Sequence, residues 1–138
     1  MISVAVIYSG KVIAYYGDRS LEREILKLAP INGLKTEQKI SNGLTFSFYC
    51  TQSLVFTCVT PQNTDQTKPL QFLDETARRF SSMIGTKIYS ATQHSLDNEF
   101  ARIFGKSIND FGTQYSRTQE IKNRLEENNH TVEIISLE

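Results

Sequence analysis

The chain has 138 residues, a length that fits one domain with a substantial hydrophobic core. Its 15 lysines and arginines balance its 15 aspartates and glutamates, so no net charge would attract nucleic acid or an anionic membrane surface. No apolar run is long enough to cross a bilayer and no signal peptide is indicated at the amino terminus, so the chain is expected to be soluble.

The amino-terminal region predicts a hairpin followed by a short helix. The segments Ile2–Tyr8 and Val12–Tyr16 are rich in β-branched side chains and flank a turn. A helix is expected to begin at Leu21 and end at Pro30, with Ser20 as its N-cap. The apolar positions of this helix recur at spacings of four and three, so one side of it should pack on a sheet: Leu21, Ile25 and Leu28.

The middle of the chain carries the strongest strand signal. Lys35–Ser41 is a polar strand that suits the edge of a sheet. Leu44–Thr60 is the most concentrated run of β-branched and aromatic residues, and it predicts two buried strands joined by a turn near Gln52. The polar positions between its apolar residues are uncharged, which indicates a sheet covered on both faces. Cys50 and Cys58 lie in these strands and are expected to be reduced core residues of a cytosolic protein.

Two helices are expected after the strands. Pro69–Ile84 is strongly amphipathic, and Gly85 is placed to end it in a left-handed conformation. A further helix is expected from Ser95 to Phe111. The order strand, strand, helix, three strands, helix, helix predicts an α+β fold, with helices packed on an antiparallel sheet.

The sequence contains no pattern that indicates catalysis, a metal site or a cofactor. His94 and His130 have no ligand partner at a metal-binding spacing. Glycine-rich phosphate loops and nucleophile motifs are absent. Two pairs of neighbouring carboxylates are expected to be solvated surface groups rather than an acid and a base: Asp74 with Glu75, and Asp97 with Glu99. We therefore expect a non-enzymatic protein without metal or cofactor.

The segment Gln114–Glu138 differs from the region before it. A heptad-like series steps by four, three, four and three residues and includes one amide: Ile121, Leu125, Asn128, Val132 and Ile135. A stripe this narrow needs a partner helix or a groove to bury it. Two alternatives are a terminal helix packed on its own domain and a disordered tail.

Four stretches of the chain carry a family resemblance. FSFYCTQSLVFTCVTPQ, PLQFLDETARRFSSMIG and SLDNEFARIF resemble, in this order, the longin domain of the synaptobrevin-like R-SNAREs of endosomes and lysosomes. EIKNRLEENNHTVEII is similar to the first half of an R-SNARE motif, with the heptad-like series on its inward layers. Ile135 stands where the family carries its central arginine. The resemblance implies a longin domain over residues 1–112 and a partial SNARE-like segment over 113–138.

For the fold, the resemblance implies a five-stranded antiparallel sheet with one helix on one face and two on the other, followed by a helical or disordered tail. It also implies an apolar groove beside the first helix and the third strand, where partners bind. On this chain the groove would be formed by Leu21, Ile25, Leu28, Ile40 and Leu44. Glu37, Gln38 and Lys39 are polar where related proteins place apolar groove residues in the third strand.

For function, the resemblance implies a regulatory and targeting domain of vesicle traffic and membrane fusion at the cytoplasmic face of endomembranes. Its expected partners are Q-SNARE helices, its own SNARE-like tail, or sorting and coat adaptors. A membrane anchor is expected only in a longer form of the protein. The alternative function is a longin-like adaptor that binds small GTPases or coat proteins without SNARE activity.

Overall fold

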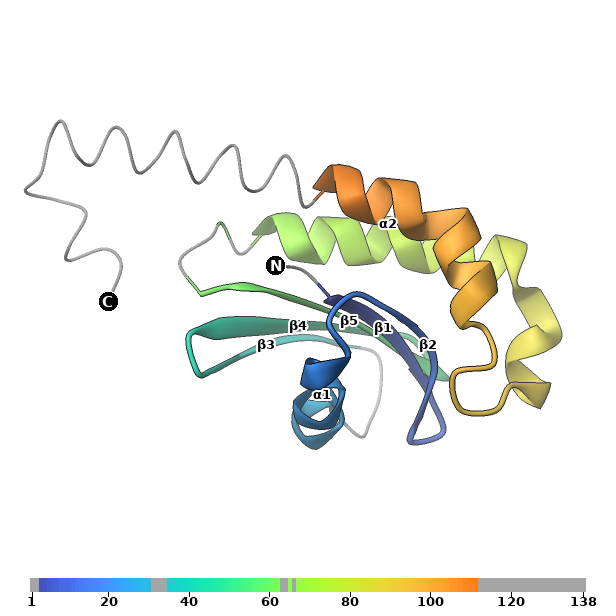
Figure 1. Ribbon diagram of the computed structural model, residues 1–138, viewed down its shortest axis with the longest axis horizontal. Helices are drawn as coiled ribbons and strands as arrows, with labels where there is room; N and C mark the ends of the chain where they lie inside the picture. Colours follow the sequence, from blue (N-terminus) through green and yellow to red (C-terminus); the bar gives the residue numbers. More distant parts are fainter. Residues whose placement is uncertain (1–2, 31–34, 63–64, 66, 112–138) are drawn as a thin grey trace, which may run out of the picture.

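A five-stranded antiparallel sheet forms the centre of the computed structural model, which describes residues 3–30, 35–62, 65 and 67–111 (Figure 1). The strand order across the sheet is β2-β1-β5-β4-β3, and every neighbouring pair is antiparallel. The strands are β1 (Ser3–Tyr8), β2 (Lys11–Tyr16), β3 (Lys35–Ser41), β4 (Leu44–Cys50) and β5 (Leu54–Pro61). The predicted SNARE-like segment, 113–138, lies outside the described residues.

Helices cover both faces of the sheet. The helix α1 (Glu22–Leu28) follows a short 3-10 turn, η1 (Arg19–Leu21), and lies on one face. The helix α2 (Thr67–Met83), the 3-10 segment η2 (Gly85–Ser90) and a helix over residues 97–111 follow the last strand. Figure 1 shows α2 and the helix over 97–111 together on the opposite face from α1. The predicted α+β arrangement, with one helix against two, is therefore confirmed for the described residues.

Two of the sheet's hairpins are closed by tight turns with positive φ at both central positions, three of which are glycine or asparagine. Ser9 and Gly10, between β1 and β2, have φ values of 52° and 78°. Asn42 and Gly43, between β3 and β4, have φ values of 52° and 77°. Positive φ at both central positions is typical of the hairpin turns that match the twist of antiparallel strands, and glycine and asparagine tolerate it best. These turns fix the register of both hairpins.

The start of α1 differs from the prediction that Ser20 is its N-cap. Leu21 stands at the N-cap position of α1 and makes no side-chain capping bond. Asp18 instead caps η1, and its Oδ1 accepts hydrogen bonds from the Ser20 N–H at 2.9 Å and the Ser20 hydroxyl at 2.7 Å. Those bonds hold the pKa of Asp18 below its usual range. The prediction was wrong because Ser20 lies inside the 3-10 turn η1, so side-chain capping occurs at the start of that turn and not at the start of α1.

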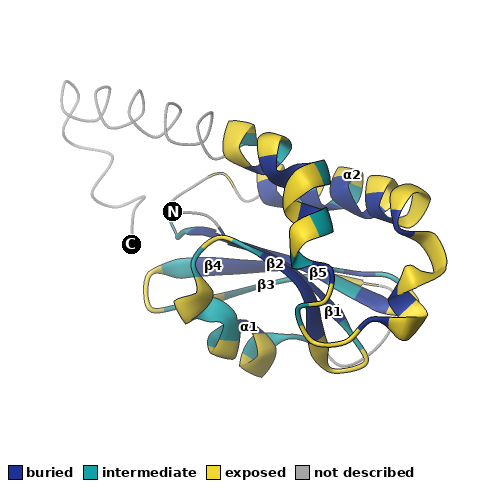
Figure 2. Ribbon diagram, turned by 45° about the vertical axis from the view of Figure 1, so that its right-hand side comes forward, coloured by how far each residue is buried: buried dark blue, intermediate teal, exposed yellow. Residues whose placement is uncertain are grey.

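The sheet face under α2 has an aromatic core. Phe80 of α2 lies at its centre, with its ring centroid 5.4 Å from that of Phe56 and 6.2 Å from those of Phe100 and Phe104. All four rings are buried. Figure 2 shows the buried inner sides of these helices against the sheet and their exposed outer sides. The predicted amphipathic pattern of both helices matches this packing.

The face under α1 has a smaller core. Ile25, which is fully buried, is the one α1 residue at the centre of a cluster with the sheet residues Ala5, Ile7, Val12, Tyr15, Phe46, Phe48 and Val59. Cys50 and Cys58 are buried free thiols on opposite faces of the sheet, since Cys50 pairs with Val55 whereas Cys58 pairs with Ser47. Side chains alternate between faces along a strand, so these two thiols cannot meet.

The two edges of the sheet differ in whether their backbone groups are hydrogen-bonded to another segment. At the β2 edge, the backbone N–H groups of His94 and Leu96 donate to the carbonyls of Val12 and Ile13, at 2.8 and 2.9 Å. The N–H of Tyr15 donates to the Asp97 carboxylate at 2.8 Å. The segment before the helix over 97–111 therefore closes this edge. At the other edge, β3 pairs only with β4 among the strands that the structure describes.

Candidate interaction site around helix α1

The predicted groove residues fall into two groups. Ile25 is a core residue, while three others are half-buried and pack on the same cluster: Leu21, Leu28 and Leu44. Ile40 is 54% exposed and is not part of that cluster. The structure therefore brings four of the five predicted residues together, and of those four Ile25 is fully buried by the fold itself.

Ile40 lies on the sheet face away from α1. It pairs with Thr45 of β4, whereas its neighbour Lys39 pairs with Phe46, which packs with Ile25. Because paired residues share a face and neighbours along a strand alternate, Ile40 and Lys39 point to opposite sides. The prediction that Ile40 lines a groove with α1 was therefore wrong.

Polar contacts fill the seam between α1 and β3. The Lys39 ammonium donates a hydrogen bond to the carbonyl of Leu28 at 2.7 Å. The hydroxyl of Ser41 donates to the Glu24 carboxylate at 2.9 Å. These contacts join the two elements directly where an apolar groove was expected, because β3 presents polar side chains to α1. The predicted groove is therefore not an apolar channel in this structure.

An open cavity of about 370 Å³ lies instead at the carboxyl end of α1. It is lined from α1 and the residues after it, from the β1–β2 turn and from the β4–β5 turn: Ile7, Ser9, Gly10, Leu26, Ala29, Pro30, Cys50, Thr51, Gln52, Ser53, Leu54 and Val55. Leu26 is 38% exposed. Burial raises the pKa of the Cys50 thiol, so this lining residue stays neutral near pH 7. We call these residues the α1 cavity.

Sequence reasoning missed the α1 cavity for an identifiable reason. Leu26 does not belong to the apolar stripe of α1, so the spacing of apolar residues predicts an ordinary surface position for it and not a binding site. The turns that complete the cavity are distant from α1 in the sequence, and only the register of the sheet brings them beside it. A large apolar residue outside the stripe of an amphipathic helix was the one available signal.

A second cavity, of about 410 Å³, lies between α2 and the helix over 97–111. Its lining is largely polar and carries charges of both signs: Lys68, Gln71, Phe72, Glu75, Thr76, Arg79, Ser107, Asp110 and Phe111. The rings of Phe72 and Phe111 stack at a centroid distance of 4.6 Å, which packs the two helices against each other. An apolar ligand segment is better matched by the α1 cavity.

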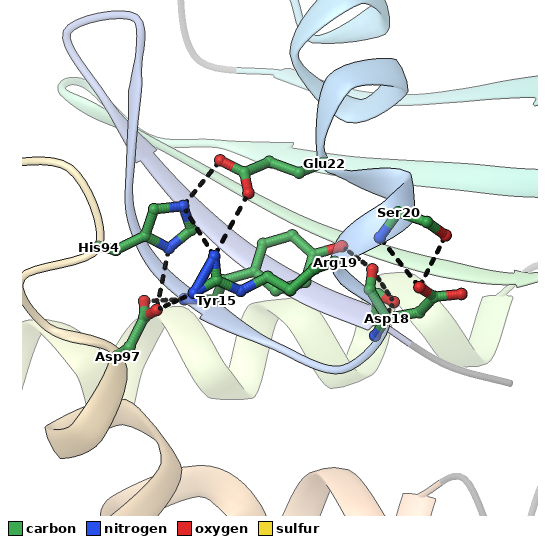
Figure 3. A network of polar contacts seen from close by, with 8 residues as sticks. Tyr15, Asp18, Arg19, Ser20, Glu22, His94 and Asp97 are labelled. Atoms are coloured by element: carbon green, nitrogen blue, oxygen red, sulfur yellow. Dashed lines mark hydrogen bonds and ion pairs between the residues drawn. The ribbon is translucent and has the colours of Figure 1, made fainter.

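A polar network ties the start of α1 to the helix over 97–111 (Figure 3). The ring nitrogens of His94 lie 2.8 Å from a Glu22 oxygen and 2.9 Å from an Asp97 oxygen. Arg19 donates to the same Asp97 oxygen at 3.1 Å. His94 adopts a φ of 60°, a left-handed backbone conformation that is uncommon outside glycine but that histidine adopts more often than most residues. The network fixes the amino end of α1, and so it also orients the helix that borders the α1 cavity.

The carboxylates considered for acid and base roles have structural partners. Asp74 accepts a hydrogen bond from the Tyr49 hydroxyl at 2.7 Å, which raises the pKa of Tyr49, and it pairs with Arg78 at 3.1 Å. Glu99 pairs with Lys87 at 3.0 Å. In the described ranges no three His, Cys, Asp or Glu side chains are arranged to hold a metal ion. Over the same ranges, no helix has the length and apolar character needed to span a bilayer.

Comparisons with known proteins identify the family. The profile of the longin family, described as a regulated-SNARE-like domain, matches residues 19–104, which is more than half of the chain. Vesicle-associated membrane protein 7 of Mus musculus is 26% identical over 113 residues, covering 78% of this chain and 51% of that protein. Vesicle-associated membrane protein 7B of Dictyostelium discoideum is 26% identical over 102 residues, covering 74% and 37%.

Vesicle-associated membrane protein 713 of Arabidopsis thaliana is 27% identical over 90 residues, covering 64% of this chain and 41% of that protein. The chain thus spans about half the length, or less, of the curated relatives it matches. The matched region includes α1, the strands β3 to β5, α2 and the first part of the helix over 97–111, whereas β1 and β2 precede it. The chain therefore belongs to the longin family of regulated-SNARE-like domains.

Proposed function

We propose that this chain is the regulatory and targeting domain of an R-SNARE-like protein of vesicle traffic and membrane fusion, and that it acts by binding apolar helical segments rather than by catalysis. The α1 cavity is the proposed docking site, and the observation that carries the proposal is this cavity on the thinly covered face of a longin fold. The proposed location is the cytoplasmic face of endomembranes.

Three features of the α1 face support the cavity as a docking site. The helix α1 has seven residues, so it covers only part of its sheet face. Leu26 places a large apolar side chain at the cavity with more than a third of its surface exposed. Side chains that are apolar or uncharged line the cavity, which suits the apolar stripe of an amphipathic helix. The partly exposed Leu21, Leu28 and Leu44 would extend the contact along α1.

The sequence supplies a matching ligand. The SNARE-like segment over 113–138 carries a narrow apolar stripe that a groove or partner helices would bury. We therefore propose two competing partners for this segment, the domain over 1–112 itself and the helices of Q-SNAREs. Sorting or coat adaptors with an apolar helical or extended segment would use the same cavity. In this proposal, docking of the segment on α1 prevents its assembly with Q-SNARE helices.

Amide hydrogen exchange on the full chain tests the docking. Leu125→Asp places a charge on the proposed stripe, and it should speed exchange at the amides around Leu26 and the β4–β5 turn if the segment docks there. Glu126→Gln, one residue along and off the stripe, is the matched control and should leave these amides unchanged. Equal exchange in all three proteins would contradict docking.

Binding of the full chain to a Q-SNARE helix peptide provides a second test of the docking. Leu26→Glu should release the docked segment and increase peptide binding, because the charge faces the α1 cavity. Met83→Glu makes the same kind of change at a 53% exposed residue on the other face, and it should have no effect. If neither Leu26→Glu nor Leu125→Asp changes binding to Q-SNARE peptides while coat adaptors or small GTPases bind the chain, the adaptor function is supported instead.

A further inference from the structure

The outer edge of β3 is open in the part of the chain that the structure describes. The strand has seven residues, pairs only with β4 among the described strands, and lies at the end of the sheet opposite the edge that His94, Leu96 and Asp97 close. An edge strand presents backbone N–H and C=O groups that another strand can pair with. Ile40 adds an apolar side chain that is 54% exposed on the α2 side of this strand.

The sequence of β3 is complementary to itself when two copies run antiparallel. With Gln38 of one copy opposite Gln38 of the other, Glu37 lies opposite Lys39, Thr36 opposite Ile40, and Lys35 opposite Ser41. A twofold axis makes each of these oppositions occur twice. Opposite charges and pairs of β-branched residues directly across from each other are the cross-strand pairs that stabilise antiparallel sheets. In this register even-numbered residues lie opposite even-numbered ones, and odd-numbered residues opposite odd-numbered ones. The backbone N–H and C=O groups that point away from β4 in one copy therefore face the corresponding groups of the other copy, as an antiparallel ladder requires.

We propose that β3 is a self-association edge, through which two copies of this chain join their sheets antiparallel around a twofold axis at Gln38. The twofold axis is perpendicular to the sheet, so both α1 helices lie on the same face. The cluster that holds Ile25 contains residues of β1, β2, β4 and β5 but none of β3, so the apolar packing of α1 lies inward from the edge. The bonds of Lys39 and Ser41 to α1 come from side chains and leave the outward backbone groups of β3 for pairing. This inference goes beyond the proposed function, because it uses neither the α1 cavity nor the segment over 113–138.

The existing charges of β3 are compatible with this pairing. Within one copy, Glu37 lies 3.5 Å from Lys35 and 3.8 Å from Lys39, with all three side chains partly exposed. In the paired arrangement each Glu37 gains a second lysine from the other copy. Ile40 is covered by Thr36 of the other copy, which removes an exposed apolar side chain from water. Because a seven-residue edge makes a small interface, the dimer should be weak and concentration-dependent.

Sedimentation of the full chain over about 10 µM to about 1 mM tests the association. Glu37→Lys and Lys39→Glu should each weaken the dimer about tenfold, since each creates two like-charged pairs across the axis. The double variant carrying both changes restores opposite charges and should return the dissociation constant to within about threefold of the original. Glu75→Lys, the same charge change on the exposed side of α2, should have no effect. A chain that stays monomeric to about 1 mM overturns the proposal.

Cross-linking tests the register independently of the charges. Under mild oxidation, Gln38→Cys should form a disulfide-linked dimer, because the two substituted residues face each other across the axis. Thr36→Cys should not, since Ile40 lies opposite it, whereas Thr36→Cys combined with Ile40→Cys should. Cys50 and Cys58 are buried and do not compete. Equal cross-linking of the Gln38→Cys and Thr36→Cys proteins, or a double charge variant that remains monomeric, would show that β3 is not paired in this register.

Discussion

The two faces of one sheet are covered very differently in this chain. Of the described elements, α2 and the helix over 97–111 lie on one face and bury a cluster of four phenylalanine rings, those of Phe56, Phe80, Phe100 and Phe104. On the other face α1 contributes a single fully buried side chain, that of Ile25. The comparison suggests a division of labour, in which the first face supplies most of the stability and the second remains available for contact.

The largest expected effect separates the two faces by stability. Phe80→Ala removes the ring at the centre of the aromatic cluster and should lower the free energy of unfolding by about 3–5 kcal/mol. Ile25→Ala on the other face should cost about 2–3 kcal/mol, because it removes a smaller side chain from a smaller cluster. Urea unfolding of the unmodified chain and the two variants, monitored by circular dichroism, measures both values.

Met83→Ala is the matched control for Phe80→Ala. It changes an exposed residue of the same helix and should shift the free energy of unfolding by less than about 0.5 kcal/mol. A larger loss for Ile25→Ala than for Phe80→Ala would mean that the α1 face carries the main core, and the comparison of the two faces would then have to be reversed.

The sequence was enough to predict the helices and strands of both faces, but not which side chains and cavities lie on the face that α1 covers. Periodic apolar residues such as Leu73 and Phe80 identify α2, and turn residues such as Gly43 locate the hairpins. The face on which a β3 side chain lies depends on strand register, which set Ile40 apart from α1. The α1 cavity depends on turns that are remote in sequence, so periodicity alone does not indicate it. The family resemblance predicted a groove beside α1 and β3, whereas the open cavity of the structure lies at the carboxyl end of α1.

The polar network around His94 was also beyond sequence reasoning. His94 contacts Glu22, which lies 72 positions earlier in the chain, and no motif or spacing connects the two. The network joins the two layers, because Arg19 and Glu22 belong to the α1 side whereas Asp97 begins the helix over 97–111. A substitution in this network on one face of the sheet should therefore change the stability of the elements on the other face.

The next effect in size tests this connection. Asp97→Ala removes the acceptor of the Tyr15 N–H and the partner of Arg19, leaving polar groups without their hydrogen bonds. We expect a loss of about 1–3 kcal/mol in the free energy of unfolding, together with faster amide exchange in α1. Chemical denaturation and hydrogen exchange measure these two results.

Glu99→Ala is the control on the same helix. Its carboxylate pairs only with the well-exposed Lys87 among the described contacts, so the loss should stay below about 1 kcal/mol and α1 should exchange as before. If Asp97→Ala destabilises the chain without changing exchange in α1, the network anchors the β2 edge alone and does not couple the two faces.

The smallest effect uses the two cysteines as probes of the two faces. Cys58 lies under α2 and is fully buried, and burial raises the pKa of its thiol above the ordinary 9.0. The folded chain therefore keeps this proton at a pH where the unfolded chain loses it. The resulting stabilisation is complete below about pH 9 and declines as the pH rises, by up to about 1.4 kcal/mol per pH unit.

Comparing the pH dependence of unfolding in three proteins isolates this contribution. Cys58→Ala should remove the part of the decline above about pH 9 that comes from Cys58. Contributions common to all three proteins cancel in the comparison, such as that of Tyr15, whose pKa is also raised by burial. Cys50→Ala should change the slope less, because Cys50 lines the α1 cavity and retains some exposure. Equal slopes for the two variants would mean that the α1 cavity excludes water to the same extent as the core under α2. Such a cavity would be too closed to receive a partner segment.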